Sequence, residues 1–290
     1  MVHKKIICRL MGGLGNQLFE YAAAYSKARK VGAELIIDKR FYEKFNYTLH
    51  GGYRLDRLNI SSRELNKEEE RIFPEWKIRI MNRFPFLSSK SKKWHHDHNG
   101  HNRACGKNVL MLGHWAKEEY FCEYHSELKE IFVPREIEKD ALTFCDKIKN
   151  TNSISIHIRR GDYVDNKDAL KVHGVCSIRY YKEAIGILLD KVKEPEVFIF
   201  SNDIEWCKKN ILDLFPPEIN VNISTGFNQE IDLWLMSNAK NHIIANSTFS
   251  WWGAWLAKNN DQIVISPWPW YESELKDYPV VTNWIAINKS

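Results

Sequence analysis

A histidine and two arginines stand where a strand is predicted to end, in the segment HIRRGDY that begins at His157. Isoleucines alternate with polar residues along Ser153–Ile158, so the two-residue period of a strand places His157 and Arg159 on the face opposite the isoleucines. Ligands of open α/β sheets bind at the carboxyl ends of parallel strands, and a guanidinium there can hold a diphosphate with two hydrogen bonds. His157, Arg159, Arg160 and Asp162 are therefore candidate ligand-binding residues. The alternative is an ion pair between Arg160 and Asp162 that only holds the loop.

Small hydroxyl residues follow a second predicted strand in the segment HIIANSTFSWW, at the point where a helix should begin. Ser247, Thr248 and Ser250 suit phosphate oxygens because backbone N–H groups point outward at a helix start, although ordinary capping would use the same residues. Asp232 lies near the start of another predicted helix, where a carboxylate is favoured in any case. In a nucleotide-binding protein it could instead accept hydrogen bonds from the N1–H and N2–H groups of guanine.

A glycine-rich loop, Gly12–Gln17, joins the first predicted strand to a helix. Glycines such as Gly13 and Gly15 let a backbone approach a ligand closely, and the following helix N-terminus attracts negative charge. The loop lacks the Gly-Lys-Ser/Thr of a P-loop, and Leu18 replaces the third glycine of the dinucleotide fingerprint. A tight turn without a ligand is the alternative interpretation.

Strand, turn and helix signals alternate in both halves of the 290-residue chain, which predicts an α/β protein. The first half opens with strands at Lys5–Leu10 and Ala33–Asp38, becomes irregular over 40–110, and continues with a strand at Val109–Trp115. A second series begins near residue 151. We expect two Rossmann-like domains, over residues 1–145 and 146–290. The strands expected in the second series are Ser153–Ile158, Val197–Ser201, His242–Ala245 and Ile263–Ser266.

Composition limits the function classes. A formal net charge of +5 suits an anionic substrate but is too weak to indicate a nucleic-acid partner. The six cysteines form no CxxC pair, and no segment has the roughly 18 apolar residues of a membrane span, so we expect a cytoplasmic protein. The basic stretch 76–107 leaves open a peripheral contact with the inner membrane or with an acceptor. The chain has no DxD pair, and we expect no bound metal.

The motifs together resemble the bacterial alpha-1,2-fucosyltransferases of glycosyltransferase family 11. The resemblance extends over nearly the whole chain, from residue 6 to about residue 270, and is specific as a set. The matching stretches are GGLGNQLFEYAAA at 12–24, HIRRGDY at 157–163, HGVCSIRYY at 173–181, IIANSTFSWWGAWL at 243–256 and, more loosely, GHWAKEEYF at 113–121.

This resemblance implies a GT-B fold with two facing Rossmann-like domains, an acceptor-side domain first and a GDP-fucose-binding domain second. It implies inverting, metal-independent transfer of L-fucose from GDP-β-L-fucose to the 2-hydroxyl of a β-galactoside glycan. Arg159 would bind the β-phosphate, and Asn16 would lie near the transferred sugar. The other assignments that it implies are guanine for His157 and Asp232, and the phosphates for Thr248 and Ser250.

An inverting transferase also needs a base that takes the proton of the acceptor hydroxyl. Asp38, at the end of a predicted strand, is one candidate, and Glu118 and Asp162 are others; each could equally be structural. Two other functions fit the same motifs: a GT-B transferase that uses another nucleotide sugar, and a non-catalytic module that binds nucleotides or glycans.

Overall fold

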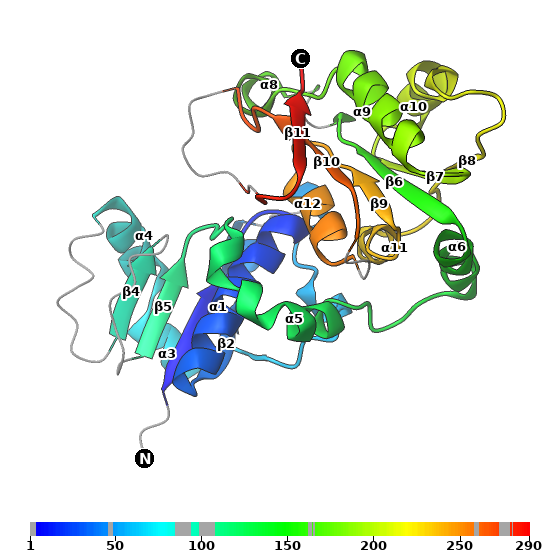
Figure 1. Cartoon of the computed structure of the whole chain (residues 1–290). Coiled ribbons are helices and arrows are strands. Elements are labelled where there is room, and N and C mark those ends of the chain that lie inside the picture. The colour runs from blue at the N-terminus through cyan, green and yellow to red at the C-terminus, as the bar shows by residue number, and fades with distance from the viewer. Residues whose placement is uncertain are drawn as a thin grey trace. The chain divides into compact units, whose positions relative to one another are not determined.

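The structure is a computed structural model that describes residues 4–45, 49–84, 94–98, 108–161, 164, 166–257, 261–272, 279 and 281–290. The chain divides into two compact units, Met1–Phe132 and Val133–Ser290, which are described separately below. Each unit has one parallel β-sheet with helices packed against it (Figure 1).

The first unit opens with a βαβ element and has the strand order β3-β2-β1-β5-β4, in which every pair is parallel. Its strands are β1 (Lys5–Arg9), β2 (Glu34–Asp38), β3 (Arg63–Glu64), β4 (Trp94–His98) and β5 (Asn108–Leu112). Its α-helices are α1 (Leu14–Val31), α2 (Arg40–Phe45), α3 (Lys67–Ile72), α4 (Glu75–Arg83) and α5 (His125–Ile131).

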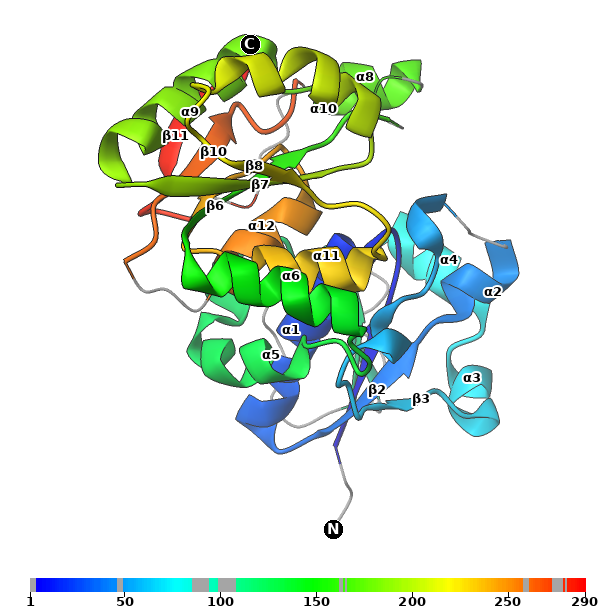
Figure 2. The same cartoon turned by 90° about the vertical axis from the view of Figure 1, so that its right-hand side faces the viewer.

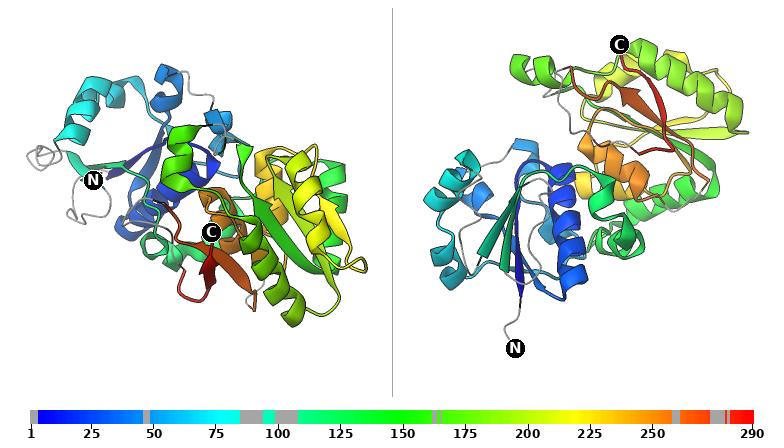
Figure 3. Two further views of the ribbon diagram at one scale, coloured as in Figure 1. Left: turned by 90° about the horizontal axis from the view of Figure 1, so that it is seen from above. Right: turned by 60° about the vertical axis from the view of Figure 1, so that its left-hand side comes forward.

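Alternate side chains of the first sheet are buried on its two faces. Ile7, Ile36 and Leu110 pack on one face with Phe73 and Ile78, from the segment that contains α3 and α4. Helix α1 lies against β1 and β2 on the other face, as the right-hand view of Figure 3 shows for the blue helix. The sheet is thus covered on both sides, which is the usual condition of a parallel sheet.

The second unit has the strand order β11-β10-β9-β6-β7-β8, again with parallel pairs throughout. From β6 the chain adds strands first on one side and then, beginning with β9, on the other, which is the order of a Rossmann fold. Its strands are β6 (Asn152–Ile158), β7 (Pro195–Ser201), β8 (Val221–Ile223), β9 (Asn241–Ile243), β10 (Val264–Trp268) and β11 (Ile285–Asn288). Its α-helices are α6 (Lys139–Asn150), α8 (Lys167–His173), α9 (Ile178–Lys191), α10 (Ile204–Asn210), α11 (Gln229–Met236) and α12 (Thr248–Trp255).

Two apolar layers hold this second sheet. Ile154, Ile156 and Ile158 of β6 pack against α9, as the alternation in the sequence predicts. Phe198 and Phe200 of β7 point to the opposite face, toward α6 and α11. Figure 2 shows α9 and α10 on one side of the sheet and α6, α11 and α12 on the other.

The predicted α/β architecture is confirmed, but the division between the units differs from the expected one. It follows Phe132 rather than residue 145, which lies inside α6. The physical reason is that α6 buries Ala141, Cys145 and Ile148 against the second sheet, and therefore belongs to that unit as a whole.

Strands β3, β4, β8 and β11 were not expected from the sequence. Two of them have only two or three residues, Arg63–Glu64 and Val221–Ile223, which is too short for a hydrophobic period to be recognised. Strand β4 has the sequence WHHDH, which carries no strand signal and becomes a strand by pairing with β5. Among the described residues, none of the helices has both the length and the apolar character needed to cross a membrane.

Candidate functional site

The motif residues of the second unit gather at the carboxyl edge of its sheet. His157 and Arg159 lie at the end of β6, and Ser247 lies beyond the end of β9 at the start of α12. Strands β6 and β9 are neighbours, and the direction of strand order reverses between them. In open α/β sheets such a reversal leaves a crevice in which ligands bind.

His157 is a buried, uncharged side chain with an open hydrogen-bonding position. Only 4% of the residue is exposed, and its ring packs against Phe249 of α12 with 5.4 Å between ring centroids. Burial, and secondarily the positive charge of Arg159, lower the pKa of His157 to about 3. Its Nδ1 atom has no hydrogen-bond partner among the residues that the structure describes. Buried polar atoms are normally satisfied, so this nitrogen fits a hydrogen bond to a ligand.

The two arginines after β6 differ in what they contact. Arg159 is half-buried at the strand end, beside His157. Arg160 turns toward α10, where its guanidinium carbon lies 4.1 Å from the centre of the Trp206 ring and its Nε lies 3.9 Å from Asp203 Oδ2. Its backbone N–H donates to Asn202 Oδ1 at 3.0 Å. The ligand roles of both arginines stay predictions, and Asp162 lies outside the described residues.

Helix α12 presents its N-terminus at the same edge and is held there by buried tryptophans. Trp251 and Trp252 are fully buried, with ring centroids 5.0 Å apart, and Trp255 stacks on Trp251 at 5.8 Å. The side chain of Ser247, the N-cap residue, makes no capping hydrogen bond within the described part of the chain. The first backbone N–H groups of the helix are thus not satisfied by that hydroxyl, as suits an anion-binding helix start.

Ser250 differs from the other hydroxyl residues of this helix start. It is fully buried, and its hydroxyl donates to the carbonyl oxygens of Ala245 and Ser247, each at 3.2 Å. These bonds give Ser250 a structural role in the turn between β9 and α12. Its contact with a phosphate stays a prediction. Ser247 and Thr248 keep the better positions for that role.

Asp232 is anchored at the carboxyl edge by a partner from another strand end. Its Oδ1 accepts a hydrogen bond of 2.6 Å from the hydroxyl of Ser224, which follows β8. Burial raises the pKa of Asp232 to about 6, and the Ser224 hydrogen bond only partly opposes this shift. Ser224 could not be recognised from the sequence, because its pairing with Asp232 depends on where β8 ends.

The glycine loop of the first unit is shaped by close backbone packing. Gly12 has φ +72°, and a Cβ there would lie 2.8 Å from Asn16 Nδ2, whereas a Cβ on Gly13 would lie 3.0 Å from His50 Cβ. Gln17 is buried and donates to the carbonyl oxygens of Gly12 at 3.1 Å and of Gly52 at 2.8 Å. The loop therefore has a fixed form, and Gly13, Gly15 and Asn16 remain candidates for ligand contact.

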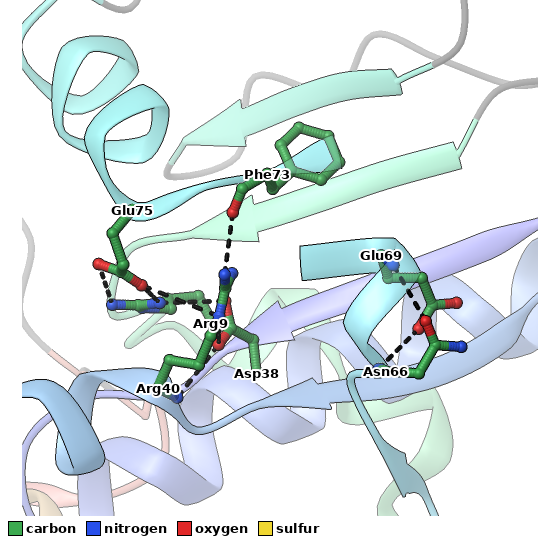
Figure 4. A network of polar contacts seen from close by, with 7 residues as sticks. All are labelled: Arg9, Asp38, Arg40, Asn66, Glu69, Phe73 and Glu75. Atoms are coloured by element: carbon green, nitrogen blue, oxygen red, sulfur yellow. Dashed lines mark hydrogen bonds and ion pairs between the residues drawn. The ribbon is translucent and has the colours of Figure 1, made fainter. Parts of the chain in front are cut away.

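Asp38 is part of a buried ion cluster (Figure 4). Arg9 Nη1 lies 3.0 Å from Asp38 Oδ2, and Arg40 donates to both carboxylate oxygens at 2.8 and 2.7 Å. Arg9 also contacts Glu75 with both Nη atoms. Burial by itself would raise the pKa of Asp38, but the hydrogen bonds of Arg40 and the charge of Arg9 outweigh it and lower that pKa.

A general base must reach its substrate with a free lone pair, and Asp38 has 0% exposure and is saturated by arginines. The structure therefore argues against Asp38 as the base that the sequence suggested. Glu118 begins a short 3-10 turn and is half-buried. A different pair, Glu20 and His114, was missed; its one sequence signal is a lone carboxylate among the apolar residues of α1.

Among the described residues, no three His, Cys, Asp or Glu side chains are grouped so as to hold a metal ion. The stretch around His101 lies outside the described side chains.

Comparison with known sequences decides the family. The sequence model described as "Glycosyl transferase family 11" matches residues 5–288. The chain belongs to glycosyltransferase family 11. The family membership that the motifs indicated is thereby confirmed.

Two similar proteins are named for the transfer of different sugars. The chain is 46% identical over 289 residues to an alpha-1,2-colitosyltransferase of Escherichia coli, covering 98% of this chain and 99% of the relative. It is 22% identical over 253 residues to galactoside alpha-(1,2)-fucosyltransferase 2 of Sus scrofa, covering 85% of this chain and 68% of that protein.

A solved structure supports the fold. The alpha-1,6-fucosyltransferase NodZ, crystallised and soaked with GDP-fucose, aligns with a TM-score of 0.51 and 14% sequence identity, over 88% of this chain and 93% of its own. At this identity the likeness concerns the fold alone. Together with two parallel α/β units, it shows that this family 11 enzyme has a GT-B-like fold, as expected.

Proposed function

We propose that this family 11 glycosyltransferase transfers L-fucose, with inversion, from GDP-β-L-fucose to the 2-hydroxyl of a galactose residue in a glycan. The observation that carries the proposal is the edge of β6 and β9, where Arg159 and the N-terminus of α12 converge at a strand-order reversal. Both supply positive electrostatic potential where a diphosphate would lie.

The chemistry of transfer explains why such an edge would serve as the donor site. As the bond to the sugar breaks, the sugar gains oxocarbenium character and negative charge grows on the departing diphosphate. Many enzymes neutralise this charge with a metal ion, but a fixed guanidinium and helix N–H groups can do the same. We therefore propose metal-independent transfer, with Arg159 on the β-phosphate and Ser247 and Thr248 beside the phosphates.

The guanine base would bind between His157 and Asp232. The open Nδ1 of the buried His157 and the carboxylate of the half-buried Asp232 would suit a purine, which has both acceptor and donor atoms. In the first unit, Asn16 and the glycine loop would contact the transferred sugar.

The identity of the sugar is the open part of this proposal, because the 46% identical relative is named for colitose. Colitose is L-fucose without its 3-hydroxyl, so the two donors differ by one polar group. A site that hydrogen-bonds that hydroxyl should reject colitose strongly, whereas an apolar pocket would discriminate weakly. GDP-colitose is therefore the second candidate donor.

One assay tests donor, acceptor and metal together. Purified protein is incubated with lactose and, separately, with GDP-fucose, GDP-colitose, GDP-mannose or a UDP-sugar, each with and without EDTA, and the linkage is read by NMR. We expect an α-1,2-linked fucosyl product at the same rate with and without EDTA. Loss of turnover on chelation would refute metal independence, and preference for GDP-colitose would reassign the donor.

The affinity for GDP should depend on pH through Asp232. If its carboxylate accepts guanine N–H groups, binding needs the ionised form, and the pKa of Asp232 in the free protein is raised to about 6. GDP affinity should be full above pH 6 and should fall by up to about tenfold per pH unit below it. Calorimetric titration with GDP from pH 5 to 8 measures this.

The matched variant for this prediction is Asp232→Asn. It should bind GDP about tenfold or more weakly at pH 7.5, because charge-assisted hydrogen bonds are lost, and its affinity should no longer change near pH 6. A variant that retained the wild-type pH profile would show that another group is responsible.

A further inference from the structure

A second polar cluster lies in the first unit, where Glu20 of α1 meets His114, two residues after the end of β5. Glu20 Oε1 lies 3.4 Å from His114 Nδ1, and Glu20 Oε2 accepts a hydrogen bond of 2.8 Å from the backbone N–H of Met11. The carboxylate is fully buried, whereas 61% of the His114 side chain is exposed. Glu20 Oε1 thus faces Nδ1 of a solvent-accessible imidazole at ion-pair distance, without hydrogen-bond geometry, and Nε2 is left for another partner.

The position of this pair in the fold is that of a ligand site. The central strand β1 is paired with β2 on one side and with β5 on the other, and the strand order reverses between β1 and β5. Met11 follows β1 and His114 follows β5, so the pair spans the carboxyl ends of these two strands. Ligands of open α/β sheets bind at such reversals, so a ligand of the first unit is expected at this edge of its sheet.

The backbone that presents His114 is held in an uncommon conformation. Gly113 has φ +119°, and Trp115 has φ +51°, which is rare for a bulky side chain. Trp115 is buried and packs edge-on against Tyr120, with 5.4 Å between the ring centroids. Conformations of this kind persist only when packing holds them, and they are concentrated at functional sites.

A buried carboxylate behind an exposed imidazole is the arrangement of a general base and the group that orients it. Resting on the proposed transferase function, we propose that His114 takes the proton of the acceptor hydroxyl and that Glu20 positions it. The acceptor O–H bond breaks and its proton goes to His114 Nε2. The acceptor oxygen forms the new bond to the anomeric carbon, while the bond from that carbon to the β-phosphate oxygen breaks and its electron pair leaves with GDP.

The charges around the pair suit this role near neutral pH. Burial raises the pKa of Glu20 to about 7, with His114, the Met11 N–H and Arg9 opposing the shift. The contact with Glu20 raises the pKa of His114. Among the described residues, two ionisable groups of β1 also act on Glu20 or respond to it. They are Arg9, which is paired with Asp38 and Glu75, and Cys8, whose pKa burial and Glu20 raise.

Two variants test the proposal in transfer assays with the donor that supports turnover. His114→Ala should lower kcat by about 100-fold or more, because general-base catalysis typically contributes that much. Its dissociation constant for GDP and its melting temperature should be unchanged, since the side chain is mostly exposed. Added imidazole should restore part of the turnover. His125→Ala, at the start of α5 in the same unit, is the matched control and should keep wild-type kcat.

Glu20→Gln tests whether Glu20 positions His114 for catalysis or only contributes to the stability of the fold. The wild-type kcat/KM should fall as the pH drops through the raised pKa of His114, because the protonated imidazole can no longer accept the acceptor's proton. Without the carboxylate the pKa of His114 falls, so the acidic limb of the profile should move to lower pH, with a lower plateau. Direct NMR titration of His114 should show the same shift.

Three outcomes would overturn the proposal. They are a kcat of His114→Ala within about threefold of wild type, an acidic limb that does not move in Glu20→Gln, and an imidazole titration insensitive to that change. If the wild type transfers sugar and one of these outcomes is found, only the base assignment fails. If the wild type transfers no sugar from any GDP-sugar, the proposed function and this inference fail together.

Discussion

Replacing Arg159 by alanine should lower kcat by about 100- to 1000-fold while the protein remains folded. The guanidinium at the end of β6 would meet the diphosphate as its negative charge grows, and a preorganised charge of this kind acts mainly in the transition state. The loss should therefore appear equally in kcat and in kcat/KM. Steady-state kinetics with saturating acceptor, together with thermal unfolding, measure both quantities.

Two further variants sharpen this prediction. Arg159→Lys keeps the positive charge but loses the bidentate geometry of the guanidinium. Its kcat should lie between those of the wild type and Arg159→Ala. Arg179→Ala removes an exposed arginine of α9 in the same unit and should leave kcat unchanged. A near-normal kcat in Arg159→Ala would show that Arg159 is not catalytic. It would also contradict the proposal that this guanidinium, in place of a metal ion, neutralises the charge on the departing diphosphate.

Replacing Asp38 by asparagine should destabilise the protein by about 3–5 kcal/mol, which is the usual effect of removing one partner from a buried ion pair. Asparagine keeps the volume but leaves the charges of Arg9 and Arg40 less compensated, at a site where Asp38 is fully buried. Urea unfolding at pH 7 should show the loss. The kcat of the folded protein should be close to that of wild type, because the side chain does not reach a substrate.

The control for this second prediction is Glu64→Gln. It removes an exposed ion pair with Lys39 in the same unit, where the two side chains are 50% and 30% exposed, and should cost no more than about 1 kcal/mol. A large loss of kcat in Asp38→Asn with unchanged stability would restore Asp38 as a catalytic candidate. Since its pKa is lowered in the folded state, the stability that Asp38 contributes should persist above its usual pKa of 3.8 and disappear only as the pH falls below it.

Much of the second unit could be predicted from the sequence. The alternation in Ser153–Ile158 gave both the strand β6 and the face that carries His157, because side-chain direction in a strand follows from position alone. Local signals also mark the starts of α9 and α10, because Ser177 and Asp203 cap these helices with side-chain hydrogen bonds. These signals involve residues that are close together in the chain, so they can be recognised in a single sequence.

Three residues could not be judged from the sequence, because their roles depend on how their side chains are used in the folded chain. Asp38 was a candidate base at a strand end, but Arg9 and Arg40 hold both of its carboxylate oxygens in the fold. Ser250 looked like a phosphate ligand, but its hydroxyl is used by the turn before α12. His114 drew no attention because the carboxylate behind it, Glu20, lies on another element.

The longer buried strands, the family motifs and the residues at the ends of those strands could be recognised in the sequence alone, because hydrophobic period and turn chemistry are properties of neighbouring residues. The fold was needed to show the four short or atypical strands, which strand ends adjoin, where the strand order reverses in each unit, and which charges pair. Those outcomes depend on strand pairing and on burial, which set residues far apart in the chain beside each other and determine whether a carboxylate is a buried ion-pair partner or orients a solvent-exposed base.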